Sequence, residues 1–145
     1  MSTVFIDTNI WCYYLDARLP EHAVMKDTVA QIIRTHEIAS NTLVIMEVAH
    51  YLTRRLEEGE ARDKLRAFTN LKTMKIHDFD KELMTSAVEL LIVYGKGTGL
   101  GGRDASILAT LEKHSIAQIV THDAALSEAA QRMGVKATDP VFQKL

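Results

Sequence analysis

Two acidic side chains each follow an apolar run that predicts a strand, and this position could place them in one site. Asp7 comes directly after residues 3–6, and Asp123 comes shortly after residues 116–120. Short runs rich in β-branched and aromatic residues predict buried strands. Open α/β sheets place their chemistry in the crevice beyond the carboxyl ends of the strands. We therefore expect Asp7 and Asp123 to lie close together at one edge of a parallel sheet.

Two further acidic residues lie in segments that otherwise predict packed helices. Glu47 interrupts the apolar run 43–49, and Asp104 precedes a helical segment on the side that carries Ile107 and Leu108. Buried charges are costly unless they are paired, hydrogen-bonded or bound to a metal. A simpler interpretation stays open, because Glu47 could lie on an exposed helix face or pair with Arg54 or another cation. Similarly, the aspartates could merely cap their helices.

A carboxylate cluster has a preferred chemistry. Four neighbouring carboxylates repel one another, so without a cation at least one of them would take up a proton. Mg²⁺ and Mn²⁺ prefer oxygen ligands and bind phosphates readily. The chain has one cysteine, Cys12, and its six histidines are not spaced as zinc ligands. If the four acids converge, we expect a Mg²⁺ or Mn²⁺ site for phosphate chemistry, in which a metal-activated water is the nucleophile.

The elements that must position these residues alternate along the chain. Apolar periodicity predicts helices at residues 21–36, 43–56, 60–71, 105–114 and 124–133, besides an apolar stretch at 10–15. A further helix, capped by Asp78 or Asp80, is predicted to run to about residue 94. Strands are predicted at residues 3–6, 37–40, 74–77, 116–120 and 135–138. This alternation predicts an α/β fold with a central, mainly parallel sheet flanked by helices on both sides. We expect one domain spanning residues 1–145.

The composition narrows the class of protein. Of the 145 residues, 47% are hydrophobic, and this fraction excludes a disordered chain. The net charge is -2, so the total charge gives no indication of a polyanionic partner. Residues 54–75 are locally basic; a solvated helix face is the simpler explanation, and a phosphate-binding patch is the alternative. With no basic leader before an apolar segment and no bilayer-length apolar run, we expect a soluble cytoplasmic protein without a membrane partner.

Four motifs together resemble a known family. They are Asp7-Thr8-Asn9 after the first strand, Glu47 in an apolar helix after Ser40, Asp104 before Ala105-Ser106-Ile107, and Thr121-x-Asp123 after a late strand. In this order and spacing they resemble the PIN domain, and more narrowly the VapC-type toxins of toxin–antitoxin pairs. The resemblance implies a metal-dependent ribonuclease on a parallel sheet. It also implies an RNA substrate, a homodimer and a cognate antitoxin that blocks the site.

The resemblance also implies roles for individual residues. The acidic quartet, by which we mean Asp7, Glu47, Asp104 and Asp123, would hold Mg²⁺ or Mn²⁺ directly or through water. Asn9 and Thr121 would orient a carboxylate or a metal-bound water, and Thr8 and Ser40 are further supporting candidates. Two departures concern substrate entry: Leu126 stands near the place where relatives commonly have an aromatic residue, and residues 95–102 are unusually rich in glycine.

Other functions remain open on the sequence alone. The chain could be an RNA-processing PIN nuclease that is not a toxin, or a non-catalytic Mg²⁺-binding interaction domain. An aspartyl phosphatase is disfavoured because Asn9 stands where such enzymes carry a second aspartate. We expect His122 to point away from the site, since neighbouring residues of an extended segment face opposite ways. We expect Arg103 to be solvated, although it could contact a phosphate.

Overall fold

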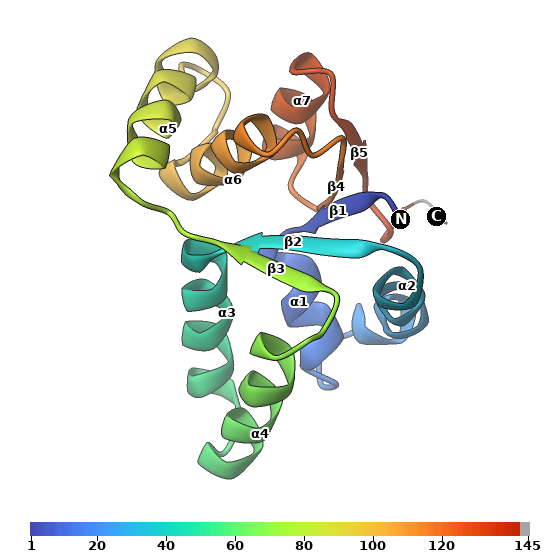
Figure 1. Ribbon diagram of the computed structural model, residues 1–145. Coiled ribbons are helices and arrows are strands. Elements are labelled where there is room, and N and C mark those ends of the chain that lie inside the picture. The colour runs from blue at the N-terminus through green and yellow to red at the C-terminus, as the bar shows by residue number, and fades with distance from the viewer. Residues whose placement is uncertain (143–145) are drawn as a thin grey trace.

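The computed structural model describes residues 1–142, which fold around a single parallel sheet (Figure 1). Its strands are β1 (Thr3–Ile6), β2 (Glu37–Asn41), β3 (Met74–His77), β4 (Gln118–Val120) and β5 (Lys136–Thr138). They lie in the order β3-β2-β1-β4-β5, and every neighbouring pair is parallel. The predicted parallel sheet is therefore confirmed.

Helices cover both faces of this sheet, as predicted. They are α1 (Thr8–Leu15), α2 (His22–Thr35), α3 (Thr42–Arg55), α4 (Glu58–Thr69), α5 (Lys81–Tyr94), α6 (Gly102–Lys113) and α7 (Ala124–Arg132). In Figure 1, α1 to α4 lie on one side of the sheet and α5 to α7 on the other. The predicted start of α4 was too late, because Glu57 accepts hydrogen bonds from the N–H groups of Gly59 and Glu60 and so draws Gly59 into the first turn.

The strand order places the carboxyl ends of β1 and β4 side by side at the point where the order of strands reverses. The chain builds the sheet outward from β1 through β2 to β3, then returns through α5 and α6 to add β4 on the other side of β1. Such a reversal is where open α/β sheets bind ligands, at the carboxyl ends of the strands. The backbone N–H of Asp7 donates to the carbonyl of Val120 at 3.0 Å. This hydrogen bond sets the segments that follow β1 and β4 side by side.

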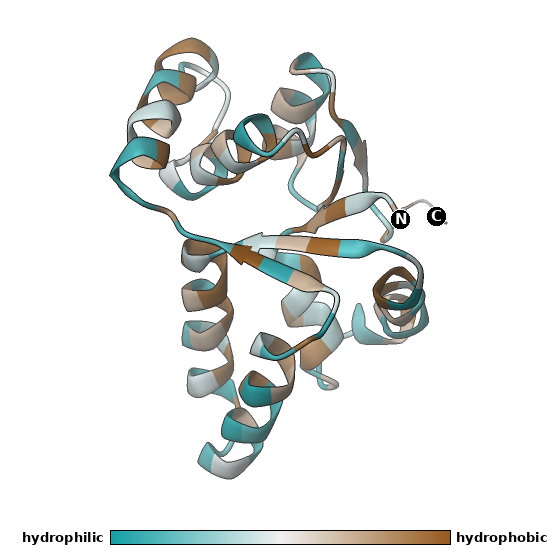
Figure 2. Cartoon of the chain, in the orientation of Figure 1, coloured by the Kyte–Doolittle hydropathy of each residue, from teal (hydrophilic) through white to brown (hydrophobic). Residues whose placement is uncertain are grey.

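The site is built on the most buried part of the molecule. Phe5 and Ile6 of β1 have no exposed surface, and Trp11 of α1 is equally buried. Its ring lies 4.7 Å from that of Phe68, centroid to centroid, which joins α1 to α4. Figure 2 shows hydrophobic residues recurring along the helices between hydrophilic ones, as expected for helices with one buried face. None of the described helices has both the length and the apolar character needed to cross a bilayer.

One buried polar residue links the two helical layers. Asn41, fully buried at the end of β2, accepts a hydrogen bond from the N–H of Val44 at 2.9 Å and so caps α3. Its amide nitrogen donates to the hydroxyl of Thr110 in α6 at 3.1 Å. Because buried polar groups are costly when they lose their partners, this amide fixes α3, which carries Glu47, relative to α6, which carries Asp104.

We predict that Asn41→Ala lowers the free energy of unfolding by about 2–4 kcal/mol, since the helix cap and the buried hydrogen bonds are lost together. Urea denaturation would measure the change. Asn70→Ala is the matched control, because Asn70 is exposed and its amide donates only to the carbonyl of Arg66. The control should lose less than about 1 kcal/mol. Equal losses in the two variants would contradict the assigned role of Asn41.

Candidate functional site

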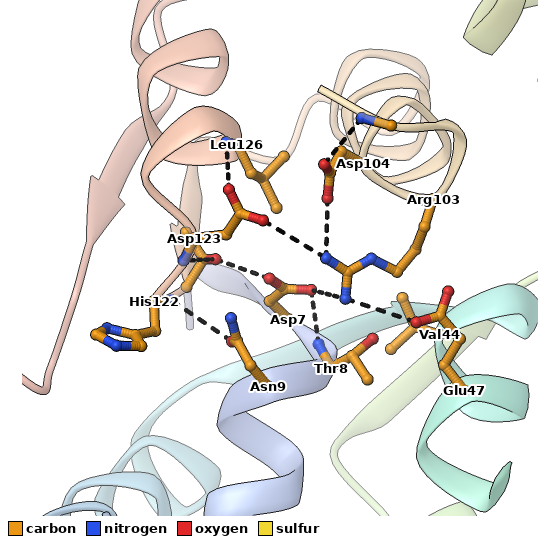
Figure 3. Close-up of polar contacts among 12 residues, drawn as sticks. Asp7, Thr8, Asn9, Val44, Glu47, Arg103, Asp104, His122, Asp123 and Leu126 are labelled. Atoms are coloured by element: carbon orange, nitrogen blue, oxygen red, sulfur yellow. Dashed lines mark hydrogen bonds and ion pairs between the residues drawn. The ribbon is translucent and has the colours of Figure 1, made fainter. Parts of the chain in front are cut away.

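The acidic quartet converges beyond the carboxyl ends of β1 and β4 (Figure 3). Its members come from four separate places in the chain. Asp7 follows β1, Glu47 is the sixth residue of α3, Asp104 lies in the first turn of α6, and Asp123 precedes α7. Segments as far apart as Asp7 and Asp123 thus contribute to one group of carboxylates.

The side chain at the centre of this group is Arg103, which we expected to be solvated. Its Nη1 lies 3.7 Å from an oxygen of Asp7 and 3.6 Å from one of Glu47. Its Nη2 lies 3.0 Å from an oxygen of Asp104 and 3.7 Å from one of Asp123. Only 26% of the side chain is exposed. The expectation was wrong because the sequence shows Asp104 beside Arg103 but not the three distant carboxylates that attract the guanidinium.

Asp7 is the most buried member of the quartet, with no exposed surface. One carboxylate oxygen accepts the N–H of Thr8 at 2.7 Å, so Asp7 is itself the cap of α1. The other accepts the hydroxyl of Thr121 at 2.7 Å. Burial raises the pKa of Asp7 above its ordinary value, although Arg103 and these hydrogen bonds oppose the rise. Helix capping and a place in the quartet therefore coexist in one residue.

Asp123 repeats this arrangement on the neighbouring strand. One of its oxygens accepts the N–H of Leu126 at 3.0 Å and caps α7, while the other faces Arg103. The hydroxyl of Thr121 accepts the N–H of Asp123 at 3.0 Å while it donates to Asp7. Thr121 thereby fixes the orientation of one carboxylate and the backbone of the other.

Asp104 and Glu47 complete the group from the two helical layers. Asp104 is the third residue of α6, not its cap, because the helix begins three residues earlier than predicted. Its carboxylate accepts the N–H of Gly101 at 3.1 Å. Glu47 is 38% exposed and pairs with Arg103, not with Arg54. Burial, followed by repulsion from Asp7 and Asp104, raises the pKa of Glu47.

The supporting candidates differ in how closely they approach the quartet. The side-chain oxygen of Asn9 accepts the N–H of His122 at 3.4 Å, which ties α1 to the segment before Asp123. The His122 ring instead pairs with Asp139 at 2.8 Å and points away from the carboxylates (Figure 3). The hydroxyls of Thr8 and Ser40 are buried and have no hydrogen-bond partner among residues 1–142. Within that range Ser40 forms no hydrogen bond to the quartet.

The donor atoms suit a hard divalent cation, but their present spacing does not. Among the described residues, no group of three or more His, Cys, Asp or Glu side chains is arranged to hold a metal ion. The guanidinium of Arg103 lies between the carboxylates and accounts for this spacing. All four donors are nevertheless carboxylates, a single guanidinium opposes their charge, and the Thr8 hydroxyl beside Asp7 lacks a partner. Oxygen donors with excess negative charge fit Mg²⁺ or Mn²⁺.

Electrostatics around Arg103 reflect the same charge excess. Burial disfavours the charged guanidinium, but Asp7, Asp104 and Glu47 outweigh this effect and raise the pKa of Arg103. The arginine therefore stays charged, and it partly neutralises a cluster that would otherwise hold ionised carboxylates at short range.

Comparisons with known proteins agree with this architecture. The sequence matches the PIN domain family over residues 4–132, whereas no curated protein matches it. VapC20 of Mycobacterium tuberculosis, a toxin that cleaves the sarcin-ricin loop, is similar in structure at 20% identity, with a TM-score of 0.72 and coverage of 87% of this chain and 94% of that one.

Two solved complexes contain similar chains. FitAcB from Neisseria gonorrhoeae matches at 18% identity and a TM-score of 0.71, covering 97% of this chain and 99% of that one. VapBC2 from Rickettsia felis, bound to a DNA fragment from the promoter, matches at 18% identity and a TM-score of 0.68, covering 94% and 97%. At these identities the structures establish a shared fold. Because the family match spans most of the sequence and the parallel sheet agrees with it, the chain belongs to the PIN domain family.

Proposed function

We propose that this protein is a Mg²⁺- or Mn²⁺-dependent endoribonuclease and the toxin of a toxin–antitoxin pair. The observation that carries the proposal is the convergence of four carboxylates from four separate segments on one cation, at the strand crossover of a PIN domain. A structural role alone would not require so much negative charge at a point where α/β folds bind ligands.

The acidic quartet would hold the metal, with Asp7, Asp104 and Asp123 as the more buried ligands and Glu47 at the open side. When bound, the ion would polarise an RNA phosphate and supply a nucleophilic water, which leaves a 5′-phosphate and a 3′-hydroxyl. The protein contributes orientation. Thr121 and the N–H of Thr8 hold both oxygens of Asp7, and the N–H of Leu126 holds one oxygen of Asp123.

Exposure indicates where the RNA would approach. Glu47 and Asp123 are 38% and 29% exposed, whereas Asp7 has no exposed surface. A phosphate would therefore enter past Glu47 and Asp123 toward the buried Asp7. Leu126, which stands near the place where relatives commonly have an aromatic residue, is fully buried and would not line this entrance.

The toxin assignment draws on the similar structures. VapC20 is a toxin, and VapBC2 and FitAcB are complexes, so we propose a cognate antitoxin partner for this chain as well. A cytoplasmic location would follow from an RNA target. We also propose a homodimer, because α5 exposes four large apolar side chains that a second copy could cover: Met84, Val88, Ile92 and Val93.

We predict that Asp7→Asn and Asp104→Asn each lower RNA cleavage by roughly a hundredfold or more, because each removes a charged metal ligand. Cleavage of single-stranded and structured RNA would be followed with Mn²⁺, with Mg²⁺ and with EDTA. Asp63→Asn is the matched control, since Asp63 is exposed on α4. Cleavage that persists in EDTA or in both quartet variants would refute the proposal. Metal binding without cleavage would favour a non-catalytic interaction domain.

Metal affinity should increase with pH. Burial raises the pKa values of Asp7 and Glu47, so these carboxyls keep protons at pH values where ordinary ones have lost them. A proton must leave before a metal can bind, and affinity is lost as the pH falls through the raised values. Calorimetric Mn²⁺ titrations should give tighter binding near about pH 7.5 than near about pH 5.5. An affinity that does not change between these conditions would contradict the prediction.

In the metal-free protein, the raised pKa values of Asp7 and Glu47 favour the folded state at low pH, whereas metal binding is favoured at high pH. A carboxyl with a raised pKa in the folded state contributes stability at low pH, and this contribution disappears as the pH rises through the raised value. The increase in melting temperature caused by Mn²⁺ should therefore be larger at the higher pH.

Expression in a bacterial host separates a toxin from a processing nuclease. We predict that the chain arrests growth and that Asp63→Asn does so equally, whereas Asp7→Asn does not, because only the last variant loses a proposed metal ligand. Growth curves after induction would measure the effect. Cleavage in vitro without growth arrest would favour the processing nuclease.

A further inference from the structure

We propose that Arg103 is an intramolecular counter-cation that occupies the metal position of the acidic quartet, so that a divalent ion must displace its guanidinium in order to bind. The inference rests on the metal site of the proposed function and goes beyond it. In this inference the guanidinium of Arg103 competes with the divalent ion and neutralises the quartet when no metal is bound.

The first support is the set of contacts. The guanidinium lies within 3.7 Å of an oxygen of every member of the quartet. Among residues 1–142 no other lysine or arginine forms an ion pair with any of these carboxylates. A group that contacts all four proposed ligands lies in the space where their common cation would have to lie.

The second support is the position of Arg103 in its helix. It is the second residue of α6, in the first turn, where the helix dipole favours anions and disfavours cations. The backbone of α6 therefore does not stabilise the charge of Arg103. The charge is stabilised by Asp104 in the same turn and by Asp7, Glu47 and Asp123 from three other segments, so the guanidinium serves the whole quartet.

The third support is the spacing that the guanidinium imposes. Only Asp104 is close enough for a hydrogen bond, at 3.0 Å, and the other three pairs are 3.6–3.7 Å long. A planar guanidinium is larger than a divalent ion, so it keeps the carboxylates further apart than the ion would. This explains why a chain with four suitable donors shows no compact metal-binding group among its described residues.

Displacement needs little rearrangement. The side chain is 26% exposed, and its guanidinium is held by one hydrogen bond to Asp104 and by three longer ion pairs. The side chain borders solvent at the exposed start of α6, where Gly101 and Gly102 are exposed. The guanidinium would swing toward this side, and the metal affinity of the native protein would include the free energy of breaking these pairs.

Mn²⁺ titration of purified variants tests the inference without relying on activity. Removing the competing cation in Arg103→Gln should tighten Mn²⁺ binding roughly tenfold or more, the equivalent of one charged hydrogen bond. Arg103→Lys keeps the charge and should stay closer to the native affinity. Arg62→Gln is the matched control, because Arg62 is 55% exposed and pairs only with Glu58 on the surface of α4; its affinity should equal that of the native protein.

Thermal denaturation provides the second measurement. Without metal, Arg103→Gln should melt below the native protein because the quartet loses its counter-charge, and saturating Mn²⁺ should close this gap. Equal or weaker Mn²⁺ binding by Arg103→Gln would overturn the role of Arg103 and leave the metal site standing. Failure of both the native protein and Arg103→Gln to bind Mn²⁺ would overturn the metal site and the proposed function as well.

Discussion

The repulsion among four carboxylates at one end of the sheet is the constraint that organises the local structure. The order β3-β2-β1-β4-β5 brings the ends of β1 and β4 together, and two aspartates follow those ends. α3 and α6 add Glu47 and Asp104 from opposite layers of the fold. Concentrated negative charge of this kind persists only with hydrogen-bond donors, positive dipoles or cations nearby, and the site contains all three.

Helix N-termini supply much of this compensation. Asp7 caps α1, Asp123 caps α7, and Asp104 lies in the first turn of α6, so three of the four carboxylates sit at the positive ends of helices. Each also accepts a hydrogen bond from a backbone N–H. Capping and chemistry are therefore not competing explanations for these aspartates. In Asp104 and Asp123 the N–H holds one carboxylate oxygen while the other faces Arg103. In Asp7 the oxygen that accepts from Thr8 also faces Arg103, and the other accepts from Thr121.

Sequence patterns predicted the fold well because they follow the burial of whole segments. The predicted strands at residues 3–6 and 74–77 have the observed limits, and the other elements agree to within a few residues. Boundaries differed where a single side chain decided the first turn, as Glu57 does for α4. The parallel arrangement followed from the alternation of strands and helices, and the grouping of the quartet followed from the parallel arrangement.

The sequence by itself determined the alternating elements, the acidic residues beyond two strand ends and the family to which the chain belongs. It could not determine the environment of Arg103, because the direction of a long side chain depends on charges that lie far away in the chain. Asp7 and Asp123 are 116 positions apart in the numbering, yet both lie within 3.7 Å of the guanidinium. Only the tertiary structure placed this cation among the four carboxylates, because electrostatic attraction acts through space and not along the sequence.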